Sequence, residues 1–393
     1  MAAAPSPRAK VPRPAFGAGG RADKSAAPRR LAGADAAFDT KTFFPLPWFE
    51  ALAALRVRRP DASAVEAAAR VRRRTLAPDG RLLIIAADHP ARMVTRAGSD
   101  PLAMGDRRAL LARLIRVLTA PGVDGLMATP DVVDDLLFLS HLVRQRGGHG
   151  WLDDKVLIGC MNRGGLAGSA FELDDRLTAY TPAGLVAIGA DGGKLMVRID
   201  PADPATAATL EACARAIDAL HARGLTVFLE AFAVQRTSAG VRPRSDPESL
   251  IQAACVAAAL GTSSTHTWLK LPYRPGYERI AAATSLPVLM LGGEVRETPA
   301  ALLEEFAGGM LAGPTVRGVL AGRNISFAAG VDPRAMAAAA AVIVHQGAGS
   351  SADDALREAR ETLQAERGRG LEVITALGNP PPIQSETPAH TAG

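Results

Sequence analysis

The chain has 393 residues, enough for one large domain or two small ones, and 48% are hydrophobic, a normal share for a globular core. Its formal charge of +5 resides in residues 1–37, which hold seven Lys or Arg against two Asp, so that 38 basic and 38 acidic residues remain elsewhere. A neutral body argues against a nucleic-acid-binding face, and no apolar run approaches the ~20 residues that cross a membrane.

Both ends of the chain are expected to be tails. Residues 1–37 have the Pro, Gly and Arg bias of disordered segments and lack the apolar stretch of a secretory signal. Residues 347–393 are similar, apart from a short helix expected over Asp353 to Gln364. The three cysteines lack metal or disulfide spacing, which predicts buried thiols in a reducing compartment. We therefore expect a cytoplasmic protein with a single domain over residues 38–346.

Between the tails, short β-rich segments alternate with longer helical ones. The expected strands are Leu82–Ala87, Gly125–Ala128, Val156–Cys160, Gly193–Ile199, Leu225–Glu230, Thr265–Leu271, Leu286–Leu291 and Val316–Ala321. The expected helices include Asp106–Leu118, Asp131–Gln145, Pro204–Ala222 and Pro247–Leu260. Strict alternation implies parallel strands, and eight repeats favour a closed α/β structure, the (β/α)8 TIM barrel. A doubly wound open sheet is the alternative, but no G-x-G-x-x-G follows the first strand.

The first expected strand is followed by a carboxylate and an imidazole. Active sites of such barrels lie at the C-terminal ends of the strands, so Asp88 and His89 are placed at the barrel mouth. A carboxylate that only caps the loop before Pro90 is the structural alternative.

The fourth expected strand carries two cations on one face. Side chains alternate along a strand, so Lys194 and Arg198 point into the barrel if the apolar Leu195 and Val197 face the helices. Burying a lysine costs several kcal/mol unless it is paired, which argues for a role for Lys194. Glu230, at the end of the fifth strand, is its natural partner. Burial could also move the pKa of Glu230 toward neutrality and make it a proton carrier, or the pair could be purely structural.

The sixth expected strand contains the candidate nucleophile. Lys270 is bracketed by apolar neighbours, and alternation places it on the inward face with Trp268 and Pro272. An amine in an apolar pocket beside a second cation, here Lys194, holds its proton less tightly. The neutral amine is the form that attacks a carbonyl.

Glycines follow the seventh and eighth expected strands. Gly292 and Gly293 end the seventh, and Gly322 precedes Arg323 at the end of the eighth. Glycines let main-chain N–H groups approach an anion, and barrels often bind phosphate at these two loops. We therefore expect a phosphate cradle there, although such pairs also form ordinary turns.

Together these segments resemble a known enzyme family. The segments are AADHP at 86–90, GADGGKLMVRID at 189–200, TWLKLP at 267–272, LPVLMLGG at 286–293 and VRGVLAGRNI at 316–325. They are similar to the class I aldolase superfamily, which includes archaeal-type fructose-bisphosphate, tagatose-bisphosphate and deoxyribose-phosphate aldolases. MNRGGLAG at 161–168 and the run TPAGLVAIGADGGK are similar to an actinobacterial subgroup found with myo-inositol degradation genes. The resemblance spans roughly residues 38–346.

The resemblance implies roles for individual residues. Lys270 corresponds to the lysine that forms a Schiff base, Lys194 to a lysine that contacts substrate oxygens, and Asp88 to an aspartate near the substrate hydroxyls. Glu230 lies where the archaeal enzymes have a tyrosine proton carrier, and the family's first motif commonly reads DHG where this chain has DHP. The four residues Gly292, Gly293, Gly322 and Arg323 correspond to the phosphate cradle, with His89 and Arg198 as further substrate-binding groups.

The function that follows is a lyase needing neither metal nor other cofactor. It would cleave a phosphorylated keto-sugar or sugar acid, and the subgroup suggests 2-deoxy-5-keto-gluconate 6-phosphate in inositol catabolism. We expect a homo-oligomer without nucleic-acid or membrane partners. One alternative is a transaldolase or acyl-transfer enzyme that uses the same lysine, and another is a phosphosugar-binding barrel without catalysis. A third is metal-dependent chemistry at Asp88, His89 and His266, whose scattered positions lack close ligand spacing.

Overall fold

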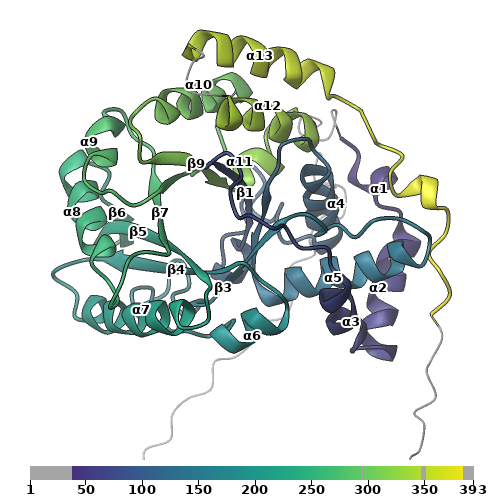
Figure 1. Cartoon of the computed structure of the whole chain (residues 1–393), viewed down its shortest axis with the longest axis horizontal. Coiled ribbons are helices and arrows are strands. Elements are labelled where there is room, and N and C mark those ends of the chain that lie inside the picture. The colour runs from purple at the N-terminus through teal and green to yellow at the C-terminus, as the bar shows by residue number, and fades with distance from the viewer. Residues whose placement is uncertain (1–37, 294, 297, 347–350, 384–393) are drawn as a thin grey trace, which may run out of the picture. The chain divides into compact units, whose positions relative to one another are not determined.

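The chain folds into a closed barrel of parallel strands surrounded by helices (Figure 1). β4 (Gly192–Ile199) pairs in parallel with both β3 (Val156–Cys160) and β5 (Thr226–Thr237), which closes the ring. The expected (β/α)8 TIM barrel is thus confirmed, and the open doubly wound sheet is wrong. The structure is a computed structural model, and the residues that it describes are 38–293, 295–296, 298–346 and 351–383.

The strands follow the apolar runs of the sequence closely. The other barrel strands are β1 (Leu82–Ala87), β2 (Gly125–Ala128), β7 (Thr267–Pro272), β8 (Val288–Leu291) and β9 (Val316–Ala321). β1, β2, β3 and β9 have the expected bounds. β4 and β8 differ by one or two residues at the start, and β7 differs by two residues at the start and one at the end. Around the ring the order is β4-β3-β2-β1-β9-β8-β7-β5, with β5 returning to β4.

β5 is longer than expected. It continues from Glu230 to Thr237 and forms an antiparallel pair with β6 (Gly240–Pro243), a strand that the sequence did not predict. The residues of this extension from Gln235 onward are exposed or half-buried and largely polar, so no apolar alternation marks them as a strand. Gly240 has φ of 99°, a conformation that favours glycine at the hairpin turn.

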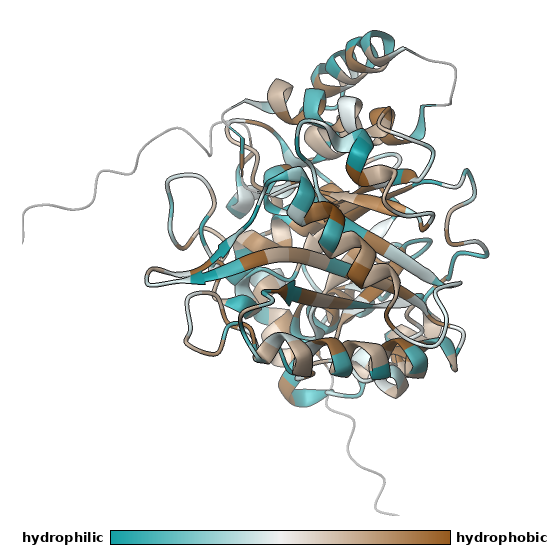
Figure 2. Ribbon diagram, turned by 90° about the vertical axis from the view of Figure 1, so that its left-hand side faces the viewer, coloured by the Kyte–Doolittle hydropathy of each residue, from teal (hydrophilic) through white to brown (hydrophobic). Residues whose placement is uncertain are grey.

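Two apolar layers hold the barrel together. Alternate strand residues fill its interior, and these are Leu82, Ile84, Ala86, Met127, Val156, Ile158, Cys160, Phe228, Leu289 and Leu320. The residues between them, such as Leu83 and Leu195, face outward and pack under the helices. Figure 2 shows that hydrophobic residues predominate in much of the strand ribbon, whereas the helices carry hydrophobic and hydrophilic residues in alternation. A charged side chain on an inward position therefore enters a closed, packed space.

Helices connect the strands on the outside of the barrel. The expected ones are present as α4 (Arg107–Leu118), α5 (Pro130–Arg144), α7 (Ala205–His221) and α8 (Pro247–Ala258). The others in this layer are α6 (Pro182–Ala187), α9 (Tyr277–Ala281), α10 (Pro299–Met310), α11 (Arg323–Ser326) and α12 (Pro333–His345). Side-chain caps fix several starts: the Asp106 carboxylate accepts a hydrogen bond from Ala109 N at 3.0 Å, for example.

Further helices from both ends of the chain lie against the barrel. They are α1 (Thr40–Phe43), α2 (Leu46–Arg58), α3 (Ala62–Ala69) and α13 (Ala352–Ala365). The Trp48 indole on α2 donates a hydrogen bond to Gly378 O at 3.0 Å, and α13 packs against α12. The short C-terminal helix is thus present, but much of residues 351–383 is packed structure, not the disordered tail that the sequence suggested. The expected disorder of residues 1–37 and 384–393 lies outside the described residues.

Two smaller expectations concern cysteines and membranes. Cys160 and Cys213 are buried as expected, whereas Cys255 is exposed, so that prediction is wrong for one of the three. Among the described helices, none combines the length and apolar character required to cross a bilayer.

Candidate active site

Four charged side chains meet inside the C-terminal end of the barrel. Lys194 Nζ lies 3.0 Å from Asp88 Oδ2 and 2.5 Å from Glu230 Oε2. Lys270 Nζ lies 2.6 Å from Glu230 Oε1. The four residues that the sequence proposed as catalytic are thus joined in one chain of ion pairs, from Asp88 through Lys194 and Glu230 to Lys270. We call them the mouth cluster.

Strand register brings these side chains together. Glu230 on β5 is paired with Lys270 on β7, and both occupy inward positions two residues after Phe228 and Trp268. Asp88 follows β1 directly and continues the inward series of Ile84 and Ala86. Each charge is therefore placed by strict alternation along an otherwise apolar strand.

The mouth cluster is almost entirely removed from water. The side chains of Lys194, Glu230, Lys270 and Asp88 are 1%, 3%, 4% and 7% exposed. Buried charges persist only when they are paired, and here each lysine contacts a carboxylate. The expected second cation beside Lys270 is present, but Glu230 lies between the two amines, so the pocket is not simply apolar.

The carboxylates are held in their ionised form. Burial alone would raise the pKa of Glu230, but Lys194 and Lys270 together lower it to about 2. The idea that burial moves the pKa of Glu230 toward neutrality is therefore wrong, because two ammonium groups outweigh desolvation. Burial opposes charge on Asp88 as well, yet Lys194 and Arg163 hold its pKa well below the usual range. Burial alone would lower the pKa of Lys194, but the carboxylates of Asp88 and Glu230 raise it.

His89 stands at the rim beside the mouth cluster. Its side chain is 20% exposed, and Nδ1 lies 3.8 Å from Asp88 Oδ1. Burial lowers the pKa of His89 to about 4. The Asp88 carboxylate acts against this shift, and the positive charges of Lys270 and Arg323 add to it. The imidazole is therefore neutral at physiological pH and can donate or accept a hydrogen bond.

The two glycine loops after β8 and β9 lie side by side. The Asn324 amide donates a hydrogen bond to Gly292 O at 2.7 Å, and Arg323 Nε donates one to Gly293 O at 3.4 Å. A Cβ on Gly322 would approach His89 Cε1 to 2.5 Å and Ala86 O to 2.4 Å. The four residues of the expected phosphate cradle thus share one corner of the mouth with His89, and Gly322 has no room for a side chain.

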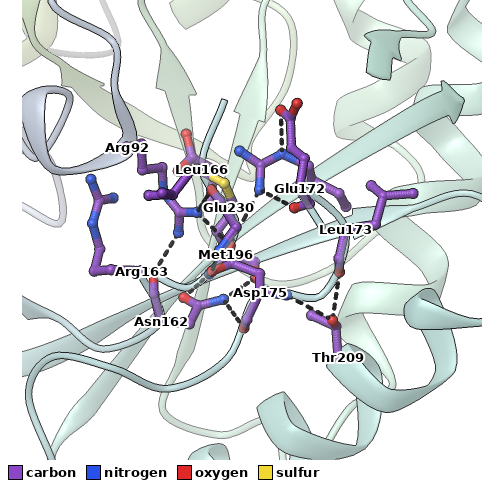
Figure 3. Close-up of polar contacts among 12 residues, drawn as sticks. Arg92, Asn162, Arg163, Leu166, Glu172, Leu173, Asp175, Met196, Thr209 and Glu230 are labelled. Carbon is purple, nitrogen blue, oxygen red and sulfur yellow. Dashed lines mark hydrogen bonds and ion pairs between the residues drawn. The ribbon is translucent and has the colours of Figure 1, made fainter. Parts of the chain in front are cut away.

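Arg198 lies farther out than the sequence suggested. Its guanidinium contacts Glu172 and Asp175 in the loop after β3, with Nη1 3.3 Å from Asp175 Oδ2. Arg92 shares that carboxylate oxygen at 2.5 Å. Arg198 is therefore buried in a second ionic network, which Figure 3 shows around the labelled Arg92, Glu172 and Asp175.

Sequence reasoning missed this second network and the residue that joins it to the mouth cluster. Arg163, in the same loop, donates to Asp88 Oδ2 at 3.0 Å and also to Asp88 O. The segment Asn162-Arg163-Gly164-Gly165 belongs to the run MNRGGLAG, which carries part of the family resemblance. Its polar and glycine residues are common in ordinary turns, so they assigned no role to Arg163.

The residues proposed as ligands in the metal-dependent alternative lie at different ends of the barrel. His266 precedes β7 and its ring packs against His221, with centroids 5.9 Å apart, at the opposite end of the barrel from Asp88 and His89. The three proposed ligands are therefore not brought together.

Comparison with known proteins now places the chain. A family model described as Cgl0159-like matches residues 80–343, which include all four residues of the mouth cluster. The chain belongs to the Cgl0159-like family. The solved structure of Cgl0159 from Corynebacterium glutamicum is 39% identical, with a TM-score of 0.70 over 77% of this chain and 97% of that one.

More distant structures share the fold of this Cgl0159-like protein. An archaeal fructose 1,6-bisphosphate aldolase is 21% identical, with a TM-score of 0.50 over 72% of this chain and all of that one. A fructose-bisphosphate aldolase from Slackia heliotrinireducens is 14% identical, with a TM-score of 0.53 over 83% and 94% of the two chains. The comparison with curated proteins finds no match.

Proposed function

We propose that this Cgl0159-like protein is a class I aldolase in which Lys270 forms a Schiff base with a ketone. The observation that carries the proposal is the contact of Lys270 Nζ with Glu230 Oε1 at 2.6 Å, deep inside the barrel. Burying two amines is costly, and a site that only bound a sugar phosphate would not need them. Aldolase chemistry needs an amine and a nearby proton acceptor, and both are present.

The first half of the reaction uses this contact directly. As substrate enters, the Lys270 ammonium transfers a proton to Glu230, and the free amine attacks the ketone to give a carbinolamine. The transfer itself removes one of the two positive charges that lower the pKa of Glu230, so the carboxylate becomes a stronger base as the amine forms. Glu230 returns the proton to the departing hydroxyl, which leaves as water, and a protonated imine remains. Lys194 and Asp88 keep Glu230 in place and offer a donor and an acceptor to the substrate hydroxyls.

The second half breaks the carbon–carbon bond. The ionised Glu230 takes the proton of the hydroxyl beyond the bond, directly or through water, and the bonding electrons flow into the imine. An aldehyde leaves and an enamine remains. Glu230 then returns the same proton to the enamine carbon, and water hydrolyses the imine to release the ketone and Lys270. The protonated imine accepts the electrons, as a metal does in the other aldolase class.

The charge of the site favours an anionic substrate. Together, the mouth cluster and the second network contain five cationic side chains (Arg92, Arg163, Lys194, Arg198 and Lys270) and four carboxylates (Asp88, Glu172, Asp175 and Glu230). Arg323 adds a further positive charge beside the glycine loops. A phosphate at that corner and a ketone carbon at Lys270 together describe a phosphorylated keto-sugar or keto-sugar acid, and the family resemblance proposes 2-deoxy-5-keto-gluconate 6-phosphate.

The test is turnover with defined substrates. Purified protein is incubated with 2-deoxy-5-keto-gluconate 6-phosphate and, separately, with fructose 1,6-bisphosphate, and dihydroxyacetone phosphate and the released aldehyde are quantified. We expect equal amounts of both products from the first compound, undiminished by a chelator. Products that form only when an acceptor aldehyde is added would instead identify a transferase. Tight binding of both compounds without any product would contradict the proposal.

A further inference from the structure

The loop after β3 reaches across to the end of β1 through one arginine. Arg163 Nη1 donates a hydrogen bond to Asp88 Oδ2 at 3.0 Å, and Nη2 donates to the main-chain carbonyl of the same residue. The Arg163 side chain is only 5% exposed. A guanidinium that holds both the carboxylate and the backbone of one residue fixes its position and its side-chain rotamer together.

The backbone that carries Arg163 is itself tightly held. The Asn162 side chain donates to Met196 O at 2.5 Å and accepts from Met196 N at 2.8 Å, which fastens the loop to β4. Arg163 N and Gly164 N both donate to Arg176 O. A Cβ on Gly164 would come within 2.6 Å of Arg176 N, so the loop returns on itself too closely for a side chain there.

The second ionic network fastens this loop to the end of β1. Arg92 follows β1, and its guanidinium donates to Gly165 O at 3.0 Å, to Asp175 Oδ2 at 2.5 Å and to Asn162 O. A Cβ on Gly165 would lie 2.3 Å from Glu172 O and 3.0 Å from Arg198 Nη1. Figure 3 shows Arg92 and Asp175 together with Asn162 and Arg163 of this loop. The loop is thus a rigid support on which Arg163 is the group facing Asp88.

With Arg163 included, the buried charges alternate in sign along one line. The order is Arg163, Asp88, Lys194, Glu230 and Lys270, with contacts of 3.0, 3.0, 2.5 and 2.6 Å. Each member is held by the charge before it, so the position of Glu230 against the reactive amine depends on Lys194, and that of Lys194 on Asp88. Arg163 is the end of the line that is anchored in the rigid loop.

We propose that Arg163 is a positioning residue for the aldolase site: it anchors the Asp88 carboxylate against Lys194 and thereby keeps Glu230 aligned with Lys270. The inference rests on the proposed function, since it assigns Arg163 a task in forming the Schiff base. Arg163 acts through Asp88 and does not itself touch the reacting atoms.

The proposal has a pH signature. The ionisable groups around Asp88 are Lys194 on β4, Arg163 in the loop after β3, the adjacent His89, Lys270 on β7, Glu230 on β5 and Cys160 on β3. Burial and the neighbouring Glu230 carboxylate oppose the negative charge of Asp88, and the nearby cations favour that charge. Loss of Arg163 removes one of the two nearest cations, which raises the pKa of Asp88 and moves the acid limb of activity to higher pH.

The experiment measures Schiff-base formation as a function of pH. Five proteins are treated with dihydroxyacetone phosphate and borohydride, and the rate of trapping is followed by intact mass. They are wild type, Arg163→Met, Arg163→Lys, Asp88→Asn and the double variant Asp88→Asn with Arg163→Met. We expect Arg163→Met to trap about 100-fold more slowly near neutral pH, with its acid limb about one unit higher. Arg163→Lys should recover about tenfold of that loss, because an ammonium reaches the carboxylate but cannot hold the carbonyl as well.

The double variant separates positioning from general structural damage. If Arg163 acts through Asp88, adding Arg163→Met to Asp88→Asn slows trapping by no more than about twofold, whereas independent effects would multiply. Arg70→Met is the matched control, because Arg70 is a buried guanidinium that donates to Leu152 O, Lys155 O and Gly189 O at the other end of the barrel. It should lower the unfolding temperature without moving the pH profile.

The outcomes are distinguishable. A wild-type protein that is never trapped contradicts the proposed function itself, and the task of Arg163 falls with it. If wild type is trapped normally, either of two results overturns the positioning role alone. One is an unchanged pH profile in Arg163→Met, and the other is a multiplicative loss of trapping rate in the double variant. If Arg163→Met does not fold, the trapping rate and pH profile of Arg163→Lys are compared with those of wild type and Asp88→Asn. An unchanged pH profile in Arg163→Lys then overturns the positioning role.

Discussion

The two ends of the barrel both carry a cluster of charged side chains, but the two clusters differ in their surroundings. At the N-terminal end, His345 contacts Asp124 at 3.0 Å and Asp79 at 2.7 Å, and Arg73 contacts Asp124 at 2.8 Å. We call these four residues the base cluster. Its carboxylates also accept main-chain hydrogen bonds, since Leu83 N donates to Asp124 and Arg81 N donates to Asp79. The base cluster therefore ties chain segments together.

The mouth cluster has another character. Its contacts join side chain to side chain, and its two amines lie within the packed interior, where apolar residues would have been cheaper to bury. The side chains of Asp79 and His345 in the base cluster are 43% and 25% exposed, against at most 7% in the mouth cluster. On the proposed function, the base cluster serves stability and the mouth cluster serves chemistry. Variants at the two ends should separate these roles.

The largest effect is expected at Lys270. Replacing it with Met keeps the aliphatic volume but removes the nucleophile, so turnover should fall by at least about 10³-fold. Glu230 keeps Lys194 as its partner, and the fold should remain intact by circular dichroism. His345→Gln in the base cluster is the comparison and should keep turnover within about twofold. Equal loss of activity from both variants would erase the distinction between the two ends.

Glu230→Gln comes next. The amide has the shape of the carboxylate but accepts no proton, so turnover should fall about 10²–10⁴-fold. It also leaves two ammonium groups without their shared counter-charge, and the unfolding temperature should drop as well. Steady-state kinetics and thermal melts measure the two effects. A variant with full activity would assign the proton transfers to another group.

The base cluster should appear in the pH dependence of stability. Although burial acts to lower it, Asp124 and Asp79 raise the pKa of His345 to about 9, from 6.5 for an ordinary histidine. A pKa raised by folding gives stability that is complete below about pH 6.5 and is lost as pH rises through about 9. The unfolding temperature should therefore fall by a few degrees between pH 6.5 and 9.5, and His345→Gln should flatten that slope. An equally steep slope in the variant would remove His345 as its source.

The smallest effect is expected where the C-terminal segment meets α2. Trp48→Phe removes the hydrogen bond to Gly378 O and part of a buried indole, which should cost about 1–2 kcal/mol of stability. Turnover should not change, because the contact is remote from the mouth cluster. Denaturant unfolding gives the free energy, and limited proteolysis shows whether residues 366–383 become accessible. An altered KM would instead connect this segment with the site.

The barrel and the mouth cluster were predictable because both follow from alternation. Apolar runs marked the eight strands, and Lys194, Glu230 and Lys270 were conspicuous as charges at inward positions of those runs. The ionised state of Glu230 was not predictable, because it depends on two lysines from different strands meeting the same carboxylate. Hydropathy alone did not show that Glu230 would stand between them.

The loop after β3, the β5–β6 hairpin and the segment after α13 escaped prediction for other reasons. Arg163 lies in a polar, glycine-rich stretch without periodicity, so its long-range contact with Asp88 left no local trace. Arg198 was assigned to the right face of β4, but its length lets the guanidinium reach Glu172 and Asp175 beyond the barrel mouth. The hairpin of β5 and β6 is polar, and residues 366–383 have turn-like composition. Only tertiary contacts order these two segments.

The most direct test of Schiff-base catalysis by Lys270 is the site of covalent capture. Borohydride is added during incubation with a keto-phosphate substrate, the protein is digested, and the modified peptide is located by mass spectrometry. Catalysis through Lys270 predicts a single reduced adduct on Lys270, which is lost in Lys270→Met. An adduct on Lys194 would show that the two amines have the opposite roles, and the absence of any adduct during measurable turnover would contradict Schiff-base catalysis.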